Sequence, residues 1–149
     1  MMFPMTKTRI LFLCTGNSCR SHMAEGWLRH LAAERFESFS AGSRPAGFVH
    51  PLAVRAMSEA GVDISGHRSK SLDEFAGREF DLLVTVCDGA REACPVFAGA
   101  KRRLHWGFDD PACATGSDEE RMAVFRRVRD EIGARIRQFL ARSDVEVKG

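Results

Sequence analysis

Hydrophobic and polar positions divide the chain into two kinds of segment. Nearly continuous apolar runs, which are typical of strands buried on both faces of a parallel sheet, occur at residues 9–14 and 80–86. Weaker runs at 38–41 and 103–106 are also predicted to be strands, and Gly42 is expected to end the first of these. The pattern therefore predicts four short strands.

Between the strands, apolar residues recur every three or four positions, as they do in amphipathic helices. The first helix should begin at about Ser21, and the second should run from Pro51 to Gly61, residue types that favour the two ends of a helix. A third begins at Ser117, which forms a capping box with Glu120. The apolar stripes comprise Met23, Ala24, Trp27, Leu28 and Leu31, then Ala53, Ala56, Met57 and Ala60, and finally Phe125, Val128, Ile132, Ile136 and Phe139.

This alternation predicts an α/β fold, a three-layer sandwich with a four-stranded parallel sheet, in a single domain over residues 1–149. Ligands of open α/β sheets bind beyond the carboxyl ends of the strands. Cys14, Cys87 and the turn at 109–111 all follow predicted strands. We therefore expect these three places to converge at one end of the sheet.

Composition excludes several classes of protein. A net charge of +2 is too small to indicate a nucleic-acid partner, and the basic run at 101–103 is expected to be a solvated edge. No apolar stretch has the length of a secretion signal or a membrane span, so we expect a cytoplasmic protein with reduced thiols. Nothing in the sequence suggests more than a monomer.

The segment after the first strand has the composition of an oxyanion-binding loop. It comprises Cys14, Thr15, Gly16, Asn17, Ser18, Cys19, Arg20 and Ser21. Backbone N–H groups in such a turn form a concave anion site, at which the following helix points its positive end. Gly16 is expected to adopt a backbone angle that a side chain would forbid, and Arg20 to offer a planar fork of donors.

The same electrostatic field stabilises a thiolate at Cys14. Ser21 could donate a hydrogen bond to its sulfur and Asn17 could hold the loop backbone, whereas Cys19 is expected to point into the fold. A thiolate in such a cradle can attack a phosphate ester or an oxidisable oxyanion. The loop alone leaves both reactions open.

Two further cysteines, Cys87 and Cys94, favour reduction. A phosphatase needs no additional thiol, whereas a reductase must carry electrons away from its nucleophile. Attack by Cys87 on a Cys14 adduct, followed by attack of Cys94 on the new disulfide, would move the oxidation outward. A helical spacing between Cys87 and Cys94 would keep them too far apart to bond, so this segment would have to unwind or loop out. Their pattern does not indicate a metal site, and we assign no role to Cys113.

The turn after the fourth predicted strand supplies a candidate acid. An oxygen that leaves a central phosphorus or arsenic atom must be protonated, and a carboxylic acid at the rim can do this. Asp110 is the candidate, because Pro111 holds it in an extended conformation, while Asp109 is expected to orient the loop. The alternative is that both aspartates are ordinary turn residues. We assign no role to the histidines, which are His22, His30, His50, His67 and His105.

Together these segments resemble the thioredoxin-coupled arsenate reductases, which share the low-molecular-weight tyrosine phosphatase fold. The resemblance runs from Arg9 to about Phe139. The matching segments are CTGNSCRS (14–21), MAEGW (23–27), FSAG (39–42), TVCDGAREACP (85–95), HWGFDDPA (105–112) and RVRDEIG (127–133).

The resemblance implies reduction of arsenate to arsenite, as in arsenic detoxification. Cys14 would be the nucleophile, Arg20 and the loop backbone would bind arsenate, and Asp110 would be the acid. Cys87 and Cys94 would form the relay, and thioredoxin would reduce the disulfide between them. The family needs no bound redox cofactor.

The alternative is a low-molecular-weight phosphatase acting on small aryl phosphates or phosphotyrosine. Phosphatases of this fold usually carry tyrosines after the Asp-Pro pair, where this chain has Ala112 and Cys113 and contains no tyrosine at all. This absence disfavours a tyrosine phosphatase. A third hypothesis, a non-catalytic oxyanion-binding or redox-sensing protein, is disfavoured by Asp110.

The resemblance has one departure. Some members of the family bind a potassium ion near the loop through Asn, Glu, Ser and Asp. Asn17, Glu25 and Ser40 match, but the fourth position holds Lys70. We therefore predict that no potassium binds, and that the Lys70 ammonium occupies the place of the ion.

Overall fold

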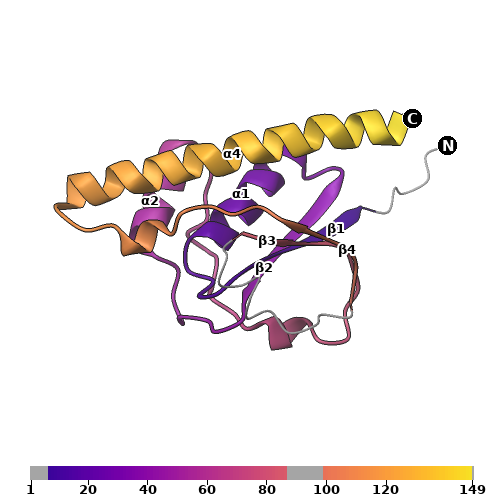
Figure 1. Cartoon of the computed structure of the whole chain (residues 1–149), viewed down its shortest axis with the longest axis horizontal. Coiled ribbons are helices and arrows are strands. Elements are labelled where there is room, and N and C mark those ends of the chain that lie inside the picture. The colour runs from indigo at the N-terminus through magenta and orange to yellow at the C-terminus, as the bar shows by residue number, and fades with distance from the viewer. Residues whose placement is uncertain (1–6, 87–98, 149) are drawn as a thin grey trace.

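The computed structural model describes the backbone of residues 7–86 and 99–148, and side chains as far as residue 142. Its elements follow one another in the order shown in Figure 1. They are β1 (Thr8–Cys14), α1 (Arg20–Ala32), β2 (Phe36–Gly42), α2 (Pro51–Glu59), the 3₁₀ turn η1 (Leu72–Phe75), β3 (Phe80–Thr85), β4 (Ala100–His105), the 3₁₀ turn η2 (Pro111–Cys113) and α4 (Asp118–Lys148).

The strands form one four-stranded sheet in the order β2-β1-β3-β4, and all neighbouring pairs are parallel. Cys14 pairs with Gly42, and Thr85 is level with both Leu13 and His105. The carboxyl ends of all four strands therefore meet at one edge of the sheet. The predicted parallel α/β architecture is confirmed.

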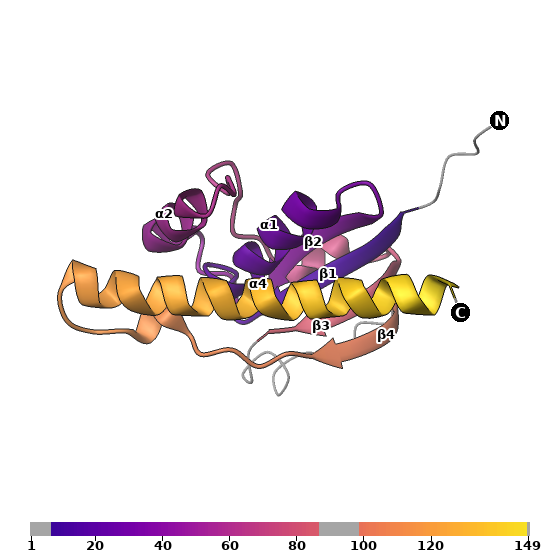
Figure 2. The ribbon, with the colours of Figure 1, turned by 90° about the horizontal axis from the view of Figure 1, so that it is seen from above.

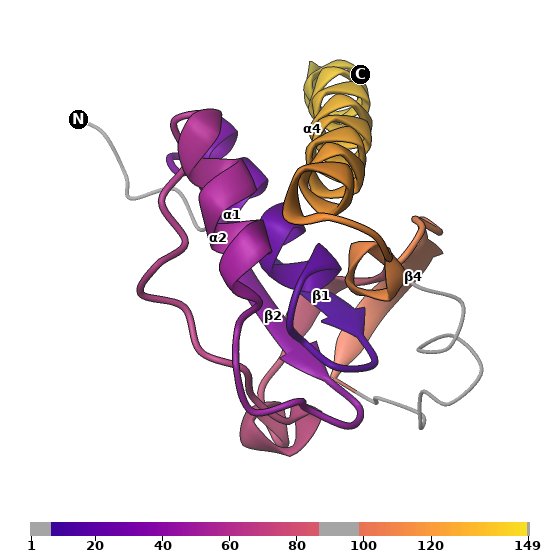
Figure 3. The same cartoon turned by 90° about the vertical axis from the view of Figure 1, so that its left-hand side faces the viewer.

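Helix α1 packs on β1 and β2, and α4 runs beside it along the length of the sheet, while α2 packs against α1 and α4 (Figures 2 and 3). On the opposite face the described residues include η1, whose Phe75 ring packs against Phe39 and Phe80 with centroids 5.8 and 5.6 Å apart. The predicted stripe of α4 is buried from Phe125 to Ile136. Burial of this stripe and of the strands supplies the core that holds the site end in place.

The predicted boundaries differ from the observed ones in all four strands. β1 begins at Thr8, β2 spans Phe36–Gly42, β3 ends at Thr85, and β4 ends at His105 and begins at Ala100 rather than at Arg103. The last error has a clear physical cause, because β4 is an edge strand whose residues 101–103 are exposed, so that it has no apolar run to detect. The exposure of these residues confirms the expected solvated basic edge.

The helix ends agree more closely with the sequence. At the start of α4, Ser117 Oγ accepts a hydrogen bond from Glu120 N and Glu120 Oε1 accepts one from Ser117 N, both at 3.1 Å. This is the predicted capping box. After α2, Gly61 adopts the left-handed conformation with φ of 81°. None of the described helices is long and apolar enough to cross a membrane.

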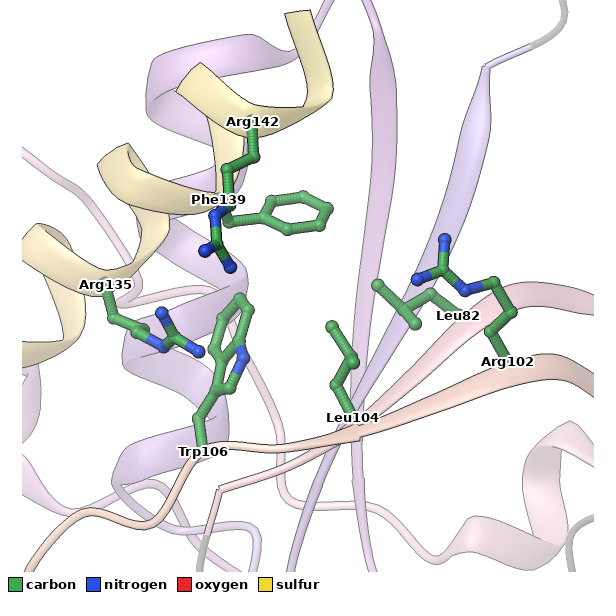
Figure 4. Close-up of a pocket in the computed structure, with 7 residues that line it drawn as sticks. All are labelled: Leu82, Arg102, Leu104, Trp106, Arg135, Phe139 and Arg142. Carbon is green, nitrogen blue, oxygen red and sulfur yellow. The ribbon is translucent and has the colours of Figure 1, made fainter. Parts of the chain in front are cut away.

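A cavity of about 140 Å³ lies between β4 and α4. Its lining combines an apolar floor with arginines, as Figure 4 shows: Leu82, Arg102, Leu104, Trp106, Arg135, Phe139 and Arg142. The Trp106 ring packs between Phe12 and Phe139. No residue of the 14–21 loop lines this cavity, so the candidate chemistry lies elsewhere.

Candidate functional site

The 14–21 loop lies at the carboxyl end of β1, between Cys14 and the first turn of α1. Five consecutive carbonyl groups, those of residues 14 to 18, each have a hydrogen-bonding partner outside the loop. The pairs are Ser43 N with Cys14 O, Arg44 N with Thr15 O, Ala46 N with Gly16 O, His22 Nε2 with Asn17 O, and His50 N with Ser18 O. All described peptide bonds are trans, so outward carbonyls turn the following N–H groups to the concave side.

Cys14 is buried and receives two polar contacts. Asn17 N donates to its Sγ at 3.2 Å, and Ser21 Oγ lies 3.2 Å from the same sulfur. Asn17 Nδ2 donates to Ser21 Oγ at 2.7 Å, so the hydroxyl keeps its own hydrogen for the sulfur. Both contacts thus stabilise a thiolate.

The expectation for Gly16 was wrong. Asn17, not Gly16, adopts the left-handed conformation, with φ of 47°. Asparagine tolerates this region better than other side chains, and the loop holds it with contacts that glycine could not make. The glycine that the loop does require is Gly42, where a Cβ atom would come within 2.7 Å of Thr15 O. Its position in the FSAG segment was the only signal for this role in the sequence.

Arg20 points from the start of α1 toward the turn after β4. Its Nη1 donates to Phe108 O at 3.0 Å, and its Nη2 lies 3.4 Å from Asp110 Oδ2. Its Nε is buried without a hydrogen-bond partner among the described residues. A buried N–H group without a partner costs free energy, and a tetrahedral oxyanion in the loop would supply the missing acceptor.

Asp110 stands at the rim, with 36% of its side chain exposed. Its Oδ1 accepts a hydrogen bond from Ala112 N at 3.0 Å and caps η2, and its Oδ2 faces Arg20 and the Cys113 thiol. Asp109 Oδ2 instead pairs with Arg127 Nη2 at 3.2 Å. The structure therefore brings Asp110, and not Asp109, to the arginine of the loop.

Cys19 differs from Cys14, although both belong to the loop. Its thiol is buried beside Ser18 Oγ, 3.7 Å away. Burial raises the pKa of the Cys19 thiol to about 12. This thiol stays protonated at neutral pH, which fits the structural role expected for it and not that of a nucleophile.

Behind the loop, Lys70 reaches the residues that the resemblance associates with potassium. Its backbone N donates to Asn17 Oδ1 at 2.8 Å, and its ammonium donates to Ser40 Oγ at 3.2 Å. Ser40 Oγ in turn donates to Glu25 Oε1. Burial lowers the pKa of Lys70, and the charge of Glu25 acts in the opposite direction. Because an ammonium already lies among these oxygens, the residues present do not fit a potassium ion.

Two histidines that the sequence left unassigned join this network. His22 Nδ1 lies 3.0 Å from His67 Nδ1, and Glu25 Oε1 lies within 4 Å of both. Burial lowers the pKa of both imidazoles, that of His22 to about 4. These three residues form a group of potential metal ligands within the described part of the chain. His22 and Glu25 are three residues apart on one helix, but the distance of His67 from both in the sequence gave no sign that it joins them.

Cys87 and Cys94 lie outside the described residues. The chain before them is described: β3 runs beside β1, and Val86 N donates to Leu13 O at 3.0 Å. Residue 86 therefore lies at the same end of the sheet as Cys14.

The chain is similar to proteins of known function. Residues 9–148 match the model of the low molecular weight phosphotyrosine protein phosphatase family. An arsenate reductase of Halalkalibacterium halodurans is 53% identical over 135 residues, which cover 91% of this chain and 96% of the relative.

Two solved structures support the same similarity. An arsenate reductase in the phosphate binding state superposes with a TM-score of 0.73 at 31% identity, over 91% of this chain and 98% of the other. A thioredoxin-dependent arsenate reductase of Corynebacterium glutamicum does so with a TM-score of 0.73 at 32% identity, over 94% of this chain and 63% of the other.

Proposed function

The chain belongs to the low molecular weight phosphotyrosine protein phosphatase family and, within it, to the arsenate reductases, and we propose that it reduces arsenate through a relay of three cysteines. In this proposal the Cys14 thiolate starts the reaction, Cys87 and Cys94 carry the oxidation away, and thioredoxin restores the thiols. The product is arsenite, and the physiological role is arsenic detoxification.

The first step forms a bond between Cys14 Sγ and arsenic. Arsenate occupies the loop, where backbone N–H groups and the Arg20 guanidinium bind its oxygens. The thiolate attacks arsenic and one oxygen leaves, protonated by Asp110. Arsenic remains in the pentavalent state in this adduct, so no electrons have yet been transferred.

The second step transfers two electrons. The Cys87 thiolate attacks Cys14 Sγ, the sulfur–arsenic bond breaks, and its electron pair remains on arsenic, which leaves as arsenite. Cys94 then attacks Cys87, which releases Cys14 as a thiolate and leaves a Cys87–Cys94 disulfide. The dithiol of thioredoxin reduces this disulfide and is itself oxidised.

One observation carries the proposal most directly: the buried Nε of Arg20 has no partner among the described residues, in a loop whose N–H groups face a stabilised thiolate. This combination suits a tetrahedral oxyanion that a sulfur atom attacks. Cys87 and Cys94, which a phosphatase would not need, support reduction rather than hydrolysis.

The direct test is oxidation of NADPH in the presence of arsenate, thioredoxin and thioredoxin reductase. The wild type should consume NADPH only when arsenate is present, and C14S, C87S and C94S should each be inactive in turnover. Mass spectrometry under thiol-trapping conditions should find a Cys14–Cys87 disulfide in C94S, because the relay stops there.

Cys113 provides the matched control. Its thiol is exposed at the rim of the site, but the relay does not use it, so C113S should retain the wild-type rate. Turnover of C87S or C94S at the wild-type rate would contradict the relay. The absence of arsenate-dependent oxidation in the wild type with any dithiol donor would contradict the proposed function as a whole.

Hydrolysis of small aryl phosphates is the second candidate. A similar arsenate reductase is described in a phosphate binding state, and Asp110 could protonate a phenolate leaving group as well as a hydroxide. The rim turn at 111–113 carries no aromatic ring to stack on a substrate. We expect slow hydrolysis of para-nitrophenyl phosphate that requires Cys14 but neither Cys87 nor Cys94.

A further inference from the structure

Asn17 is held by all four of its polar groups. Its N donates to Cys14 Sγ, its Nδ2 donates to Ser21 Oγ, its Oδ1 accepts from Lys70 N, and its O lies 3.0 Å from His22 Nε2. A left-handed residue other than glycine persists only where its surroundings fix it. Three of these contacts are with the loop or the backbone, and the fourth comes from a histidine side chain.

The partners of His22 determine where its proton lies. A carbonyl oxygen only accepts, so His22 Nε2 must carry the hydrogen that binds Asn17 O. His22 is fully buried, and with its pKa lowered to about 4 the ring is neutral at pH 7, so Nδ1 is an acceptor. His67 Nδ1, 3.0 Å away, must then be the donor.

The chain of hydrogen bonds extends from His67 to the surface. Because His67 Nδ1 carries the hydrogen, a neutral His67 offers a lone pair at Nε2, and Arg29 Nη1 donates to it at 2.9 Å. Hydrogen bonds therefore run in one direction from Arg29 through His67 and His22 to Asn17 O. Each member fixes the tautomer of the next.

Among the described residues, no other neighbour could supply the proton to His22 Nδ1. Ser40 Oγ lies 3.4 Å away, but it gives its hydrogen to Glu25 Oε1 and accepts from Lys70 Nζ. The charged groups that act on the two imidazoles are Glu25, Arg29, Asp63 and Lys70. The carboxylates of this set accept protons and the cations have other acceptors, so His67 remains the donor.

We propose that His22 and His67 are positioning residues for arsenate reduction: His22 holds the Asn17 carbonyl outward and thereby aims the Ser18 N–H into the oxyanion loop, and His67 fixes the tautomer in which His22 can do so. The two groups of a trans peptide point in opposite directions, so the direction of Asn17 O sets that of Ser18 N–H. A donor aimed in advance at an oxyanion contributes strongly to binding and catalysis. The inference rests on the proposed function only for its catalytic part.

A metal ion held by His22, Glu25 and His67 is the competing interpretation. A metal between the two Nδ1 atoms would replace the proton that they share. It would also lie in a network that already contains the Lys70 ammonium and the Arg29 guanidinium, whose charges oppose a further cation. The proton chain is therefore the arrangement that the charges favour.

The test compares two substitutions of His22. Glutamine can donate through its amide nitrogen and accept through its oxygen, whereas leucine can do neither. With inorganic phosphate as the probe, H22L should bind about tenfold more weakly than the wild type, and H22Q should bind within a factor of about two of it. H67L removes the donor to His22 Nδ1 and the acceptor of Arg29 but keeps His22 itself, so its phosphate affinity should lie between those of H22L and H22Q. In turnover, H22L should raise the KM for arsenate more than it lowers kcat.

Urea unfolding separates this role from a general loss of structure. His30 is the matched control, since it lies on the exposed side of the same helix, and H30Q should behave as the wild type in every measurement. H22L with wild-type phosphate affinity, or a folded H22Q as weak as H22L, would overturn the proposal. So would stoichiometric zinc in the purified protein whose removal by a chelator weakens phosphate binding.

Phosphate binding requires neither arsenate nor thioredoxin. If the wild type fails to reduce arsenate but the ranking of phosphate affinities holds, the proposed function fails and the positioning role of His22 stands. If arsenate is reduced but the variants do not show this ranking of phosphate affinities, the positioning role is wrong and the proposed function stands.

Discussion

The two sides of the Cys14 loop are built in opposite ways. On the concave side, polar groups are left available: the loop N–H groups turn inward, and Arg20 Nε has no partner among the described residues. On the convex side, the polar groups are used: five carbonyls are bonded outward, and Asn17 is held at four points. The loop therefore offers donors to a ligand because its acceptors are occupied by the protein.

This difference separates two kinds of contribution. Residues of the concave side act on the substrate directly, so their loss should appear in turnover with little change in stability. Residues of the convex side act through the shape of the loop, so substituting them should lower both the turnover rate and the free energy of unfolding. Four experiments test how far this division holds.

The largest effect is expected for Arg20→Lys, which keeps the charge but removes the planar fork. Lysine cannot supply both Nε and Nη donors, so turnover should fall by about 10²–10³-fold. The free energy of unfolding should change little, because the substitution leaves the convex side intact. Arsenate-dependent NADPH oxidation measures turnover, and urea unfolding measures stability. A rate within a few-fold of the wild type would show that Arg20 does not act directly on the substrate.

Asp110→Asn should have the next largest effect. Asparagine can still cap η2 through its oxygen, but it cannot protonate a leaving oxygen, so kcat should fall by about 10²-fold. Phosphate should still bind, because Arg20 and the loop N–H groups remain. Asp109→Asn is the control, since Asp109 pairs with Arg127 away from the loop. Equal losses in both variants would contradict the assignment of the acid.

The convex side should make stability depend on pH. The pKa of His22 is lowered from 6.5 to about 4 in the folded chain, so between these values the unfolded state binds more protons. Stability should therefore be complete above pH 6.5 and decrease as the pH falls toward 4. At pH 5 the protonation of His22 in the unfolded state alone lowers the free energy of unfolding by about 2 kcal/mol relative to its value at high pH. The lowered pKa of His67 adds to the same trend.

Urea unfolding of the wild type and of His22→Gln at pH 7.5 and 5.0 measures this contribution. The variant should lose less stability on acidification, because glutamine does not titrate. Glu25, whose pKa is also lowered, contributes its own loss only at more acid pH, as its ordinary value is 4.5. An equal loss in the two proteins would show that His22 does not become charged on unfolding in this range.

The smallest effect is expected for potassium. Because the Lys70 ammonium binds Ser40 and faces Glu25, replacing sodium by potassium at equal ionic strength should leave the rate unchanged within error. Lys70→Asp removes the ammonium and adds a carboxylate, and this variant should respond to potassium. A clear activation of the wild type by potassium over sodium would contradict the assigned role of Lys70.

The functional residues of the concave side could be predicted from the sequence because most of them lie close together along the chain. Cys14 and Arg20 stand in one eight-residue segment after an apolar strand, and Asp110 is marked by the proline that follows it. The alignment of the carboxyl ends followed from the alternation of strands and helices, whereas the order β2-β1-β3-β4 came only from the structure. The parallel sheet was therefore predictable, except at its polar edge strand.

The convex side could not be read in this way. His22 and His67 are 45 residues apart, and only the tertiary fold shows that their rings meet. The error over Gly16 has the same origin, because the contacts of Asn17 decide which residue takes the left-handed conformation. The sequence shows that a loop contains a glycine. Only the structure shows that Gly42 is required, because Thr15 O lies where a Cβ atom would stand.

The outward carbonyl bonds of the loop also bear on how a very small ligand can be bound well. Arsenate has few atoms with which to offset the conformational entropy lost when a loop becomes ordered around it. In this chain the ordering of the 14–18 backbone accompanies folding, and the core that packs during folding stabilises it. Binding then restricts mainly the anion itself, so little of its hydrogen-bond free energy is lost in ordering the loop.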